Sequence, residues 1–311
     1  MTIQSPKISY LGPPATFSHE AAIGLFGADA NLIPLTTIPS VMQSVRADEA
    51  FCGVVPIENS IHGEVTTTMD ALVFDFVGLY AHSEIVVPVS FCAFARTEDD
   101  SQPKVVLSHP HAIAQCRGFV NSLAAEVRNS DSTARACEEV ATSADPGMIA
   151  IASMAAGRMY GLRLMASKIE DYPGAATKFY ALSKHFSVPS GNDKSLLVLI
   201  PRSQDTGTLV RLLSPFSNQR IDVVSIHSRP LRSSLGSYCF ILTVAGHIGQ
   251  PPLFSVLNEI VSSGTALKFL GSFPAWKGTL PAAPFETIKG ASDRPADTSG
   301  CLESMRVEGT S

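Results

Sequence analysis

One unit recurs along the first half of this chain: a short apolar run, a polar turn, and a segment with apolar residues spaced as on a helix face. Its clearest example runs from the apolar residues 52–55, through a proline and the polar residues 58–60, to a helix-like pattern over 65–72. Strands that alternate with helices in this way predict an α/β fold with a mostly parallel sheet. Ligands of such sheets bind where strands end and helices begin.

Polar turns also follow the strands predicted at 8–11 and 104–107, and polar residues precede the helices expected near residues 17 and 133. Free backbone N–H groups at helix starts suit an anion, and hydroxyls there can cap the helix or bind a ligand. An Asx turn that only caps a helix is the alternative for 58–60. Polar side chains at these positions are Thr16, Ser18, Ser108, His109, Ser132 and Thr133. His109 precedes a proline, so it is either a general acid or a turn residue bonded to backbone.

Composition narrows the class of protein. A net charge of -5 with dispersed basic residues argues against nucleic acid as a partner. The six cysteines stand singly, with no CxxC pair, so the sequence indicates no zinc site and no redox motif. No apolar stretch reaches the length of a membrane span, and the start of the chain has no apolar signal core. We therefore expect a cytoplasmic protein with no membrane partner.

The pattern also predicts the domain organisation. We expect an α/β domain over 7–185, with one lobe formed by 7–80 plus 175–185 and the other by 81–174. The hinges between these lobes are expected near Tyr80 and 169–175. A polar linker over 186–193 precedes strand and helix patterns in the order βαββαβ over 194–276, the ferredoxin-like order. The final residues, 277–311, have few large apolar side chains, which predicts a disordered tail.

Eight short motifs follow one another along the chain. They read Tyr10-Leu11-Gly12-Pro13, Thr16-Phe17-Ser18, Val55-Pro56-Ile57-Glu58-Asn59-Ser60, Ser108-His109-Pro110, Tyr160-Gly161-Leu162, Thr177-Lys178-Phe179, Gly207-Thr208-Leu209 and Ser228-Arg229-Pro230. Together they resemble the prephenate dehydratase family, over nearly the whole chain up to Trp276. The last two resemble the ACT regulatory domain of that family.

The resemblance implies a two-lobed, periplasmic-binding-protein-like catalytic domain and a ferredoxin-like ACT domain. It also implies a reaction in which prephenate loses its ring hydroxyl and ring carboxylate, giving phenylpyruvate, carbon dioxide and water. Aromatisation drives this step, so the resemblance implies no cofactor. Thr177 would donate a hydrogen bond to the leaving hydroxyl, because hydroxide is a poor leaving group. The catalytic residues implied are Thr177, Lys178, Glu58, Asn59 and Ser60, and no metal is implied. The substrate-binding residues implied are Thr16, Ser18, Ser108, His109, Ser132, Thr133 and Phe179, which would line the cleft between the lobes.

Three positions depart from the family pattern. Lys178 stands where the family usually has arginine, Ala175 where it has asparagine, and His227 where it has glutamate. The first two touch the predicted site, so a prephenate decarboxylase that does not aromatise its substrate is one alternative. A non-catalytic protein that binds a small anion or an amino acid is another. The presence of Thr177 favours dehydration.

The ACT resemblance implies regulation by L-phenylalanine. In the family, two ACT domains pair and phenylalanine binds at their interface as a feedback inhibitor, so we expect a homodimer or homotetramer. The candidates for contacts with the polar groups of the effector are Asp205, as an acceptor for its ammonium group, and Asn218. The residues implied at this site are Gly207, Thr208, Leu209, His227, Ser228, Arg229 and Pro230.

Overall fold

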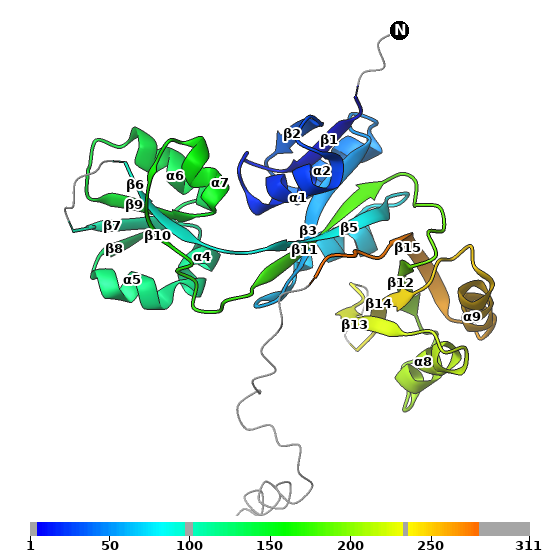
Figure 1. The fold of residues 1–311 in the computed structure, drawn as a ribbon. Helices are drawn as coiled ribbons and strands as arrows, with labels where there is room; N and C mark the ends of the chain where they lie inside the picture. The colour runs from blue at the N-terminus through cyan, green and yellow to red at the C-terminus, as the bar shows by residue number, and fades with distance from the viewer. Residues whose placement is uncertain (1–4, 97–101, 233–235, 280–311) are drawn as a thin grey trace, which may run out of the picture. The chain divides into compact units, whose positions relative to one another are not determined.

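The computed structural model describes residues 5–96, 102–232 and 236–279, which form three β-sheets with their helices (Figure 1). We call the parts the N-terminal lobe (5–88 and 176–185), the middle lobe (92–167) and the C-terminal domain (193–279). Within the described residues, no helix is long and apolar enough to span a bilayer. Most of the predicted tail, with Cys301, lies outside the described residues.

The N-terminal lobe is a six-stranded sheet in the order β2-β1-β3-β11-β5, with β4 paired to β3. Strands β1, β2 and β3 are parallel, and β11 runs antiparallel to both of its neighbours. Its elements are β1 (Lys7–Leu11), α1 (Phe17–Phe26), β2 (Asn31–Leu35), α2 (Ile38–Arg46), β3 (Cys52–Asn59), β4 (Gly63–Glu64), α3 (Thr66–Asp70), the π-helix η1 (Ala71–Asp75), β5 (Tyr80–Pro88) and β11 (Ala176–Ser183).

Strand β3 is longer than the sequence indicates. We expected it to break at Pro56, but it continues to Asn59. Lys178 pairs with Glu58 and Phe179 with Pro56, so Ile57 is the extra residue of a bulge. A bulge accommodates the proline, which has no N–H for the ladder. Residues 58 and 59 are therefore strand residues, and their side chains lie on opposite faces of the sheet.

Side chains of β11 show what each face of this sheet contacts. Phe179 and Ala181 pack in the cluster that includes Ala21 and Ala22 of α1. Tyr180 and Leu182 pack on the other face, in a cluster that includes residues of α2, η1 and the C-terminal domain. The two faces of one strand therefore serve two different interfaces.

The middle lobe is a five-stranded sheet in the order β10-β6-β9-β7-β8. Strands β8 and β10, which the sequence analysis does not predict, form its two edges, and most of their residues are exposed or half-buried. Weak apolar patterning is typical of edge strands, because one side of the ladder faces water. The elements are β6 (Cys92–Ala95), β7 (Val105–Ser108), α4 (Pro110–Gln115), α5 (Arg117–Leu123), β8 (Glu126–Asn129), α6 (Thr133–Thr142), β9 (Met148–Ala152), α7 (Met154–Met159) and β10 (Arg163–Ser167).

Two chain segments connect the lobes. We expected the first crossing near Tyr80, but β5 pairs with β11 in the N-terminal lobe, so the chain crosses at residues 89–91. The second crossing runs over 168–175. Val89 N donates to Ala175 O at 2.7 Å, and Ile169 N donates to Phe91 O at 3.1 Å. The two crossings are thus hydrogen-bonded to each other.

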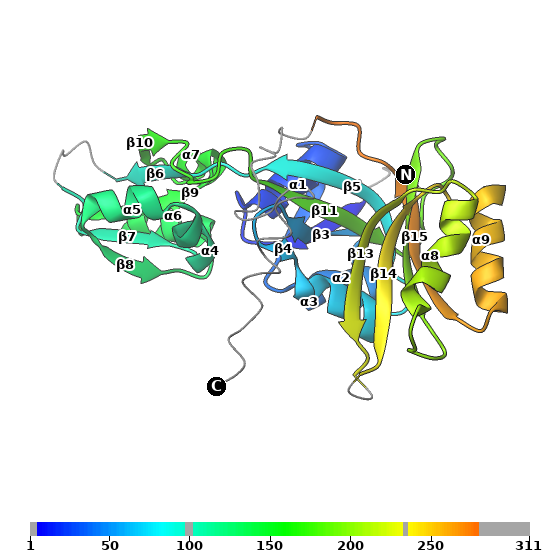
Figure 2. The same cartoon turned by 90° about the horizontal axis from the view of Figure 1, so that it is seen from below.

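The C-terminal domain has the predicted βαββαβ order and an antiparallel sheet β13-β14-β12-β15. Figure 2 shows α8 and α9 on one face of this sheet, where they pack on Leu197 and Leu199 of β12. The alternate residues Leu196 and Val198 pack against the N-terminal lobe. The elements are β12 (Asp193–Ile200), α8 (Thr208–Asn218), β13 (Val223–Pro230), β14 (Tyr238–Ala245), α9 (Pro251–Ser262) and β15 (Ala266–Pro274).

Candidate active site

A cleft of about 750 Å³ has lining residues from both the N-terminal and the middle lobe. It lies at the strand ends and helix starts, where a ligand of an α/β protein is expected. Seven of the predicted site residues line it: Thr16, Ser18, Asn59, His109, Ser132, Thr133 and Thr177. They come from segments more than a hundred residues apart in the sequence.

Thr177 and Asn59 are paired residues of β11 and β3, and their side chains meet at the cleft. Asn59 Nδ2 donates to Thr177 Oγ1 at 2.9 Å. Asn59 Oδ1 accepts from the backbone N–H groups of Ile61 and His62 at 3.0 and 3.1 Å. These two bonds orient the amide, so its NH₂ group faces the threonine. Because the oxygen of Thr177 accepts from Asn59, its own O–H proton is available to a ligand.

The starts of two long helices also line the cleft. Thr16 caps α1 by accepting from His19 N, and Ser132 caps α6 by accepting from Arg135 N at 3.0 Å. The capping hydroxyls are used by their helices, whereas the remaining N–H groups of the first turns have no partner within the helix. Ser18 and Thr133 lie in these first turns and line the cleft. Each lobe therefore presents a helix N-terminus, which suits an anion with two charged groups.

The cleft has no permanently charged cation among its described lining residues, because none of them is lysine or arginine. Lys178 and Glu58, which we predicted to be catalytic, instead form an ion pair, with Lys178 Nζ 2.7 Å from Glu58 Oε2. They line a small cavity beside the C-terminal domain. Successive side chains of a strand lie on opposite faces of the sheet. Lys178 follows the cleft residue Thr177 and Glu58 precedes the cleft residue Asn59, so both side chains lie on the face away from the cleft.

Three further predicted residues do not line the cleft either. Ser60 ties the end of β3 to β11, because its Oγ accepts from Ala176 N at 3.0 Å. Ser108 is fully buried and donates to Ile151 O at 2.6 Å. Phe179 belongs to the core against α1. Their motifs are thus explained by packing and backbone hydrogen bonds.

Ala175, which the sequence analysis places in the site, is also absent from the described lining of the cleft. Its side chain is 3% exposed and packs in a core cluster with Val89 and Phe91. Two of the departures from the family pattern, at positions 175 and 178, therefore lie outside the cleft.

Three histidines gather in the cleft, and the sequence analysis singled out only one of them. His62 comes from the N-terminal lobe, and His109 and His111 come from the start of α4. The rings of His62 and His111 are 5.0 Å apart between centroids, and those of His109 and His111 are 4.9 Å apart. His109 Nδ1 accepts from His111 N at 3.2 Å. Single histidines without a periodic pattern gave no signal in the sequence, because contacts across a cleft arise only on folding.

The surroundings of these histidines favour their neutral forms. Burial lowers the pKa of His62 and His109, and nearby His111 lowers both further. Asp131, which also lines the cleft, acts on the pKa of His109 in the opposite direction. A protonated ring in this cluster costs free energy until an anion enters the cleft.

This environment predicts how stability depends on pH. Because the pKa of His109 is lowered by folding, the unfolded chain binds more protons below its ordinary pKa of about 6.5. The contribution of neutral His109 to the stability of the fold is therefore complete above that pH and is lost as the pH falls below it. We expect the free energy of unfolding to fall between about pH 7.5 and about pH 5.5 less steeply in His109→Asn than in the wild type. Asparagine keeps a cap before α4. We expect the change in unfolding free energy over this pH range to differ between variant and wild type by at most about 1 kcal/mol, because His109 is partly exposed. Urea unfolding at several pH values measures it, and equal slopes would contradict this assignment.

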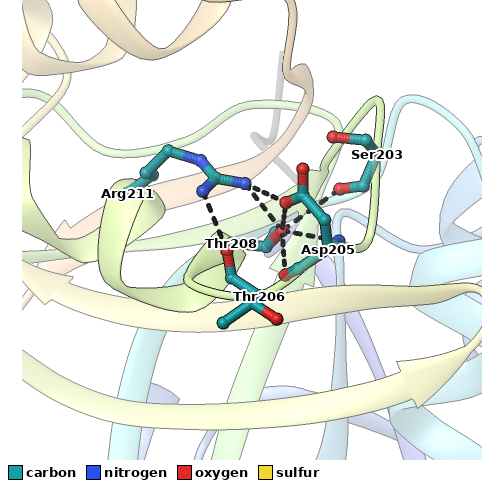
Figure 3. A network of polar contacts seen from close by, with 5 residues as sticks. All are labelled: Ser203, Asp205, Thr206, Thr208 and Arg211. Carbon is teal, nitrogen blue, oxygen red and sulfur yellow. Dashed lines mark hydrogen bonds and ion pairs between the residues drawn. The ribbon is translucent and has the colours of Figure 1, made fainter.

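The predicted effector residues lie at two places in the C-terminal domain. Gly207 has a φ of +85° and precedes α8, a conformation that favours glycine. Thr208 Oγ1 lies 2.8 Å from Asp205 Oδ1, and Arg211 also bonds this carboxylate (Figure 3). Hydrogen bonds from Thr208 and Arg211 lower the pKa of Asp205. The carboxylate that we considered for an ammonium group is therefore already engaged.

The second place is β13, an edge strand whose residues alternate in exposure. His227 and Arg229 are half-buried and both contact Glu64 of the N-terminal lobe. Ser228 and Pro230 are exposed, and so are Leu209 in the first turn of α8 and the apolar residue Ile226. The motif 228–230 therefore has one side on the N-terminal lobe and one side open.

Comparisons with known proteins agree with this architecture. Residues 8–187 match the family model described as prephenate dehydratase. The prephenate dehydratase of Amycolatopsis methanolica is 33% identical over 298 residues, which cover 92% of this chain and 96% of that protein. The crystal structure of a prephenate dehydratase from Arthrobacter aurescens in complex with L-Phe has a TM-score of 0.77 at 29% identity, covering 96% of this chain and 99% of that chain.

One further solved structure carries a different description. It is a protein described as a novel type of quorum quenching acylase, with a TM-score of 0.77 at 25% identity, covering 90% of this chain and all of the other. The same fold therefore occurs under two described activities, and fold alone does not decide between them. The family model and the full-length sequence match do decide the family. The chain belongs to the prephenate dehydratase family.

Proposed function

We propose that this protein is a prephenate dehydratase, which converts prephenate to phenylpyruvate, carbon dioxide and water in the biosynthesis of phenylalanine. The observation that carries the proposal is the hydrogen bond from Asn59 to Thr177 inside the cleft of a member of this family. The bond turns the threonine into an oriented donor.

The reaction needs one proton and one oriented donor. The bond between the ring and its carboxylate breaks, and its electron pair enters the ring as the carboxylate leaves as carbon dioxide. The ring becomes aromatic while the bond to the hydroxyl on the opposite ring carbon breaks. The leaving hydroxide takes up a proton and departs as water, so the dianion and one proton yield a monoanion and two neutral molecules. Thr177 donates its O–H to the departing oxygen, and the bond from Asn59 strengthens that donation.

Binding of the dianion rests on the helix starts. The first turns of α1 and α6 supply N–H groups to the carboxylates, with Ser18 and Thr133 beside them. The histidine cluster, His62, His109 and His111, adds positive charge when it takes up protons on ligand entry. Crossings at 89–91 and 168–175 serve as hinges between the lobes.

The test is direct. Purified full-length protein is mixed with prephenate, and phenylpyruvate is measured by its absorbance in alkali. We expect product in the wild type and a loss of about a hundredfold in turnover in Thr177→Ala. Carbon dioxide without phenylpyruvate would instead identify a decarboxylase that does not aromatise prephenate, and binding without turnover would identify a non-catalytic binder.

The C-terminal domain is proposed to be an ACT domain that binds L-phenylalanine and pairs with a second copy. Three observations support this: its βαββαβ order, its open edge strand β13, and the apolar side chains exposed beside that edge. Val224 and Ile226 of β13 itself are 44% and 38% exposed. Apolar exposure beside an unpaired strand edge suits strand-to-strand pairing between subunits. Sedimentation of the full chain tests the pairing.

A further inference from the structure

Glu64 places a negative charge at the edge of the cleft. It is half of the two-residue strand β4, which pairs with Glu58 and Asn59 of β3. Its side chain is 10% exposed, and the residue lines both the cleft and the small cavity beside the C-terminal domain. Screening by solvent is weak at such a site, so an unpaired Glu64 repels an anionic ligand in the cleft.

The charge that balances Glu64 comes from the C-terminal domain. Arg229 Nη2 donates to Glu64 Oε1, and His227 Nδ1 lies 3.3 Å from Glu64 Oε2. Both residues belong to β13, more than 160 residues further along the chain. Lys178 of β11, which lines the same small cavity as Glu64, is already paired with Glu58 at 2.7 Å. Arg229 is therefore the permanent positive charge that contacts Glu64 in the described structure.

Arg229 is not saturated by these contacts. Its Nε lies 3.7 Å from Asp70 Oδ1 and is a buried nitrogen with no hydrogen-bond partner in the described part of the chain. One guanidinium thus faces two carboxylates, and one of its donors is unused. A buried unused donor gives a competing acceptor a favourable place to bind.

We propose that Arg229 is a positioning residue for the cleft: by neutralising Glu64, it allows the dianionic substrate to bind. This inference rests on the proposed function. It also gives the effector a route of action. A carboxylate that binds beside the Arg229 guanidinium competes with Glu64 for it, and the charge of Glu64 then returns to the cleft. Inhibition by this route raises KM and leaves kcat nearly constant.

The experiment compares full-length variants by steady-state kinetics with prephenate. Arg229→Met removes the charge, and Arg229→Met/Glu64→Gln removes the charge together with the carboxylate that it balances. The matched control is Arg232→Met, because Arg232 Nη1 pairs with Asp75 Oδ1 at 2.7 Å between the same two parts, and Asp75 is absent from the described cleft lining. We expect KM to rise roughly tenfold in Arg229→Met, to return to within about threefold of the wild type in the double variant, and to stay unchanged in the control.

Three results would overturn the inference. They are an unchanged KM in Arg229→Met, an equally raised KM in the double variant, and the same rise in Arg232→Met. Arg229→Lys covers the case in which the methionine variant does not fold: it retains the charge, so KM should stay within about threefold of the wild type. If the wild type does not convert prephenate, the proposed function fails first. If the wild type converts prephenate and KM is unchanged by these substitutions, only this inference fails.

L-phenylalanine tests the effector route. In the wild type we expect it to raise KM for prephenate, and in Glu64→Gln we expect no such rise, because no charge remains to be exposed. An equal rise in Glu64→Gln would show that inhibition travels by another route. Absence of any effect in the wild type would also overturn this step.

Discussion

Alanine at position 177 is expected to lower kcat for prephenate by about a hundredfold or more, while KM changes by less than about threefold. The hydroxyl of Thr177 accepts from Asn59. In the proposed mechanism it donates to the leaving oxygen, an interaction that strengthens as charge develops on that oxygen. Its loss therefore affects the transition state more than the bound substrate. Stopped assays of phenylpyruvate over a range of prephenate concentrations measure both constants.

Two companion variants separate the hydroxyl from its surroundings. Thr177→Ser keeps the oxygen and should retain much of the activity. Asn59→Ala keeps the threonine but removes its donor, and we expect a loss of about tenfold, since the hydroxyl is then free to rotate. If the alanine variant at 177 turns over like the wild type, Thr177 does not contact the leaving group.

Methionine at position 194 is expected to lower the free energy of unfolding by about 3–5 kcal/mol. Lys194 Nζ lies 2.6 Å from Glu84 Oε1, and the Glu84 side chain is 1% exposed. The same oxygen accepts from Trp276 N at 2.9 Å. Methionine fills a similar volume but leaves a buried carboxylate without its counter-charge. Because Glu84 is in β5 and Lys194 in β12, the loss also weakens packing between the N-terminal lobe and the C-terminal domain.

The chain offers a matched control for this substitution. Lys184 pairs with Asp48 at the same distance of 2.6 Å, but the Asp48 side chain is 79% exposed. Lys184→Met should therefore cost about 1 kcal/mol or less. Urea unfolding followed by circular dichroism compares the two variants. Equal losses would mean that burial of Glu84 does not govern the strength of its ion pair.

Local patterns in the sequence were sufficient for the architecture. Apolar runs, turn residues and capping side chains act over a few residues, so they predicted the α/β class and the βαββαβ order, both of which are confirmed. The prediction of a mostly parallel sheet was wrong, because β4, β5, β6, β10 and β11 pair antiparallel, and strand direction depends on how distant segments return to the sheet. Thr16 and Ser132 cap their helices as their positions indicate. Edge strands β8 and β10 were missed, because half-exposed strands carry little apolar pattern.

The face on which each side chain lies was decided only by the tertiary structure. Glu58 and Asn59 are neighbours in the sequence, as are Thr177 and Lys178, yet a bulge at Ile57 and the pleat of the sheet place one of each pair in the cleft and the other behind it. Contacts over long sequence separations, such as Asn59 with Thr177 and Glu64 with Arg229, leave no periodic trace in the chain. Sequence motifs supplied candidate residues, and folding determined which of them share one cleft, because only the packed sheets set distance and direction.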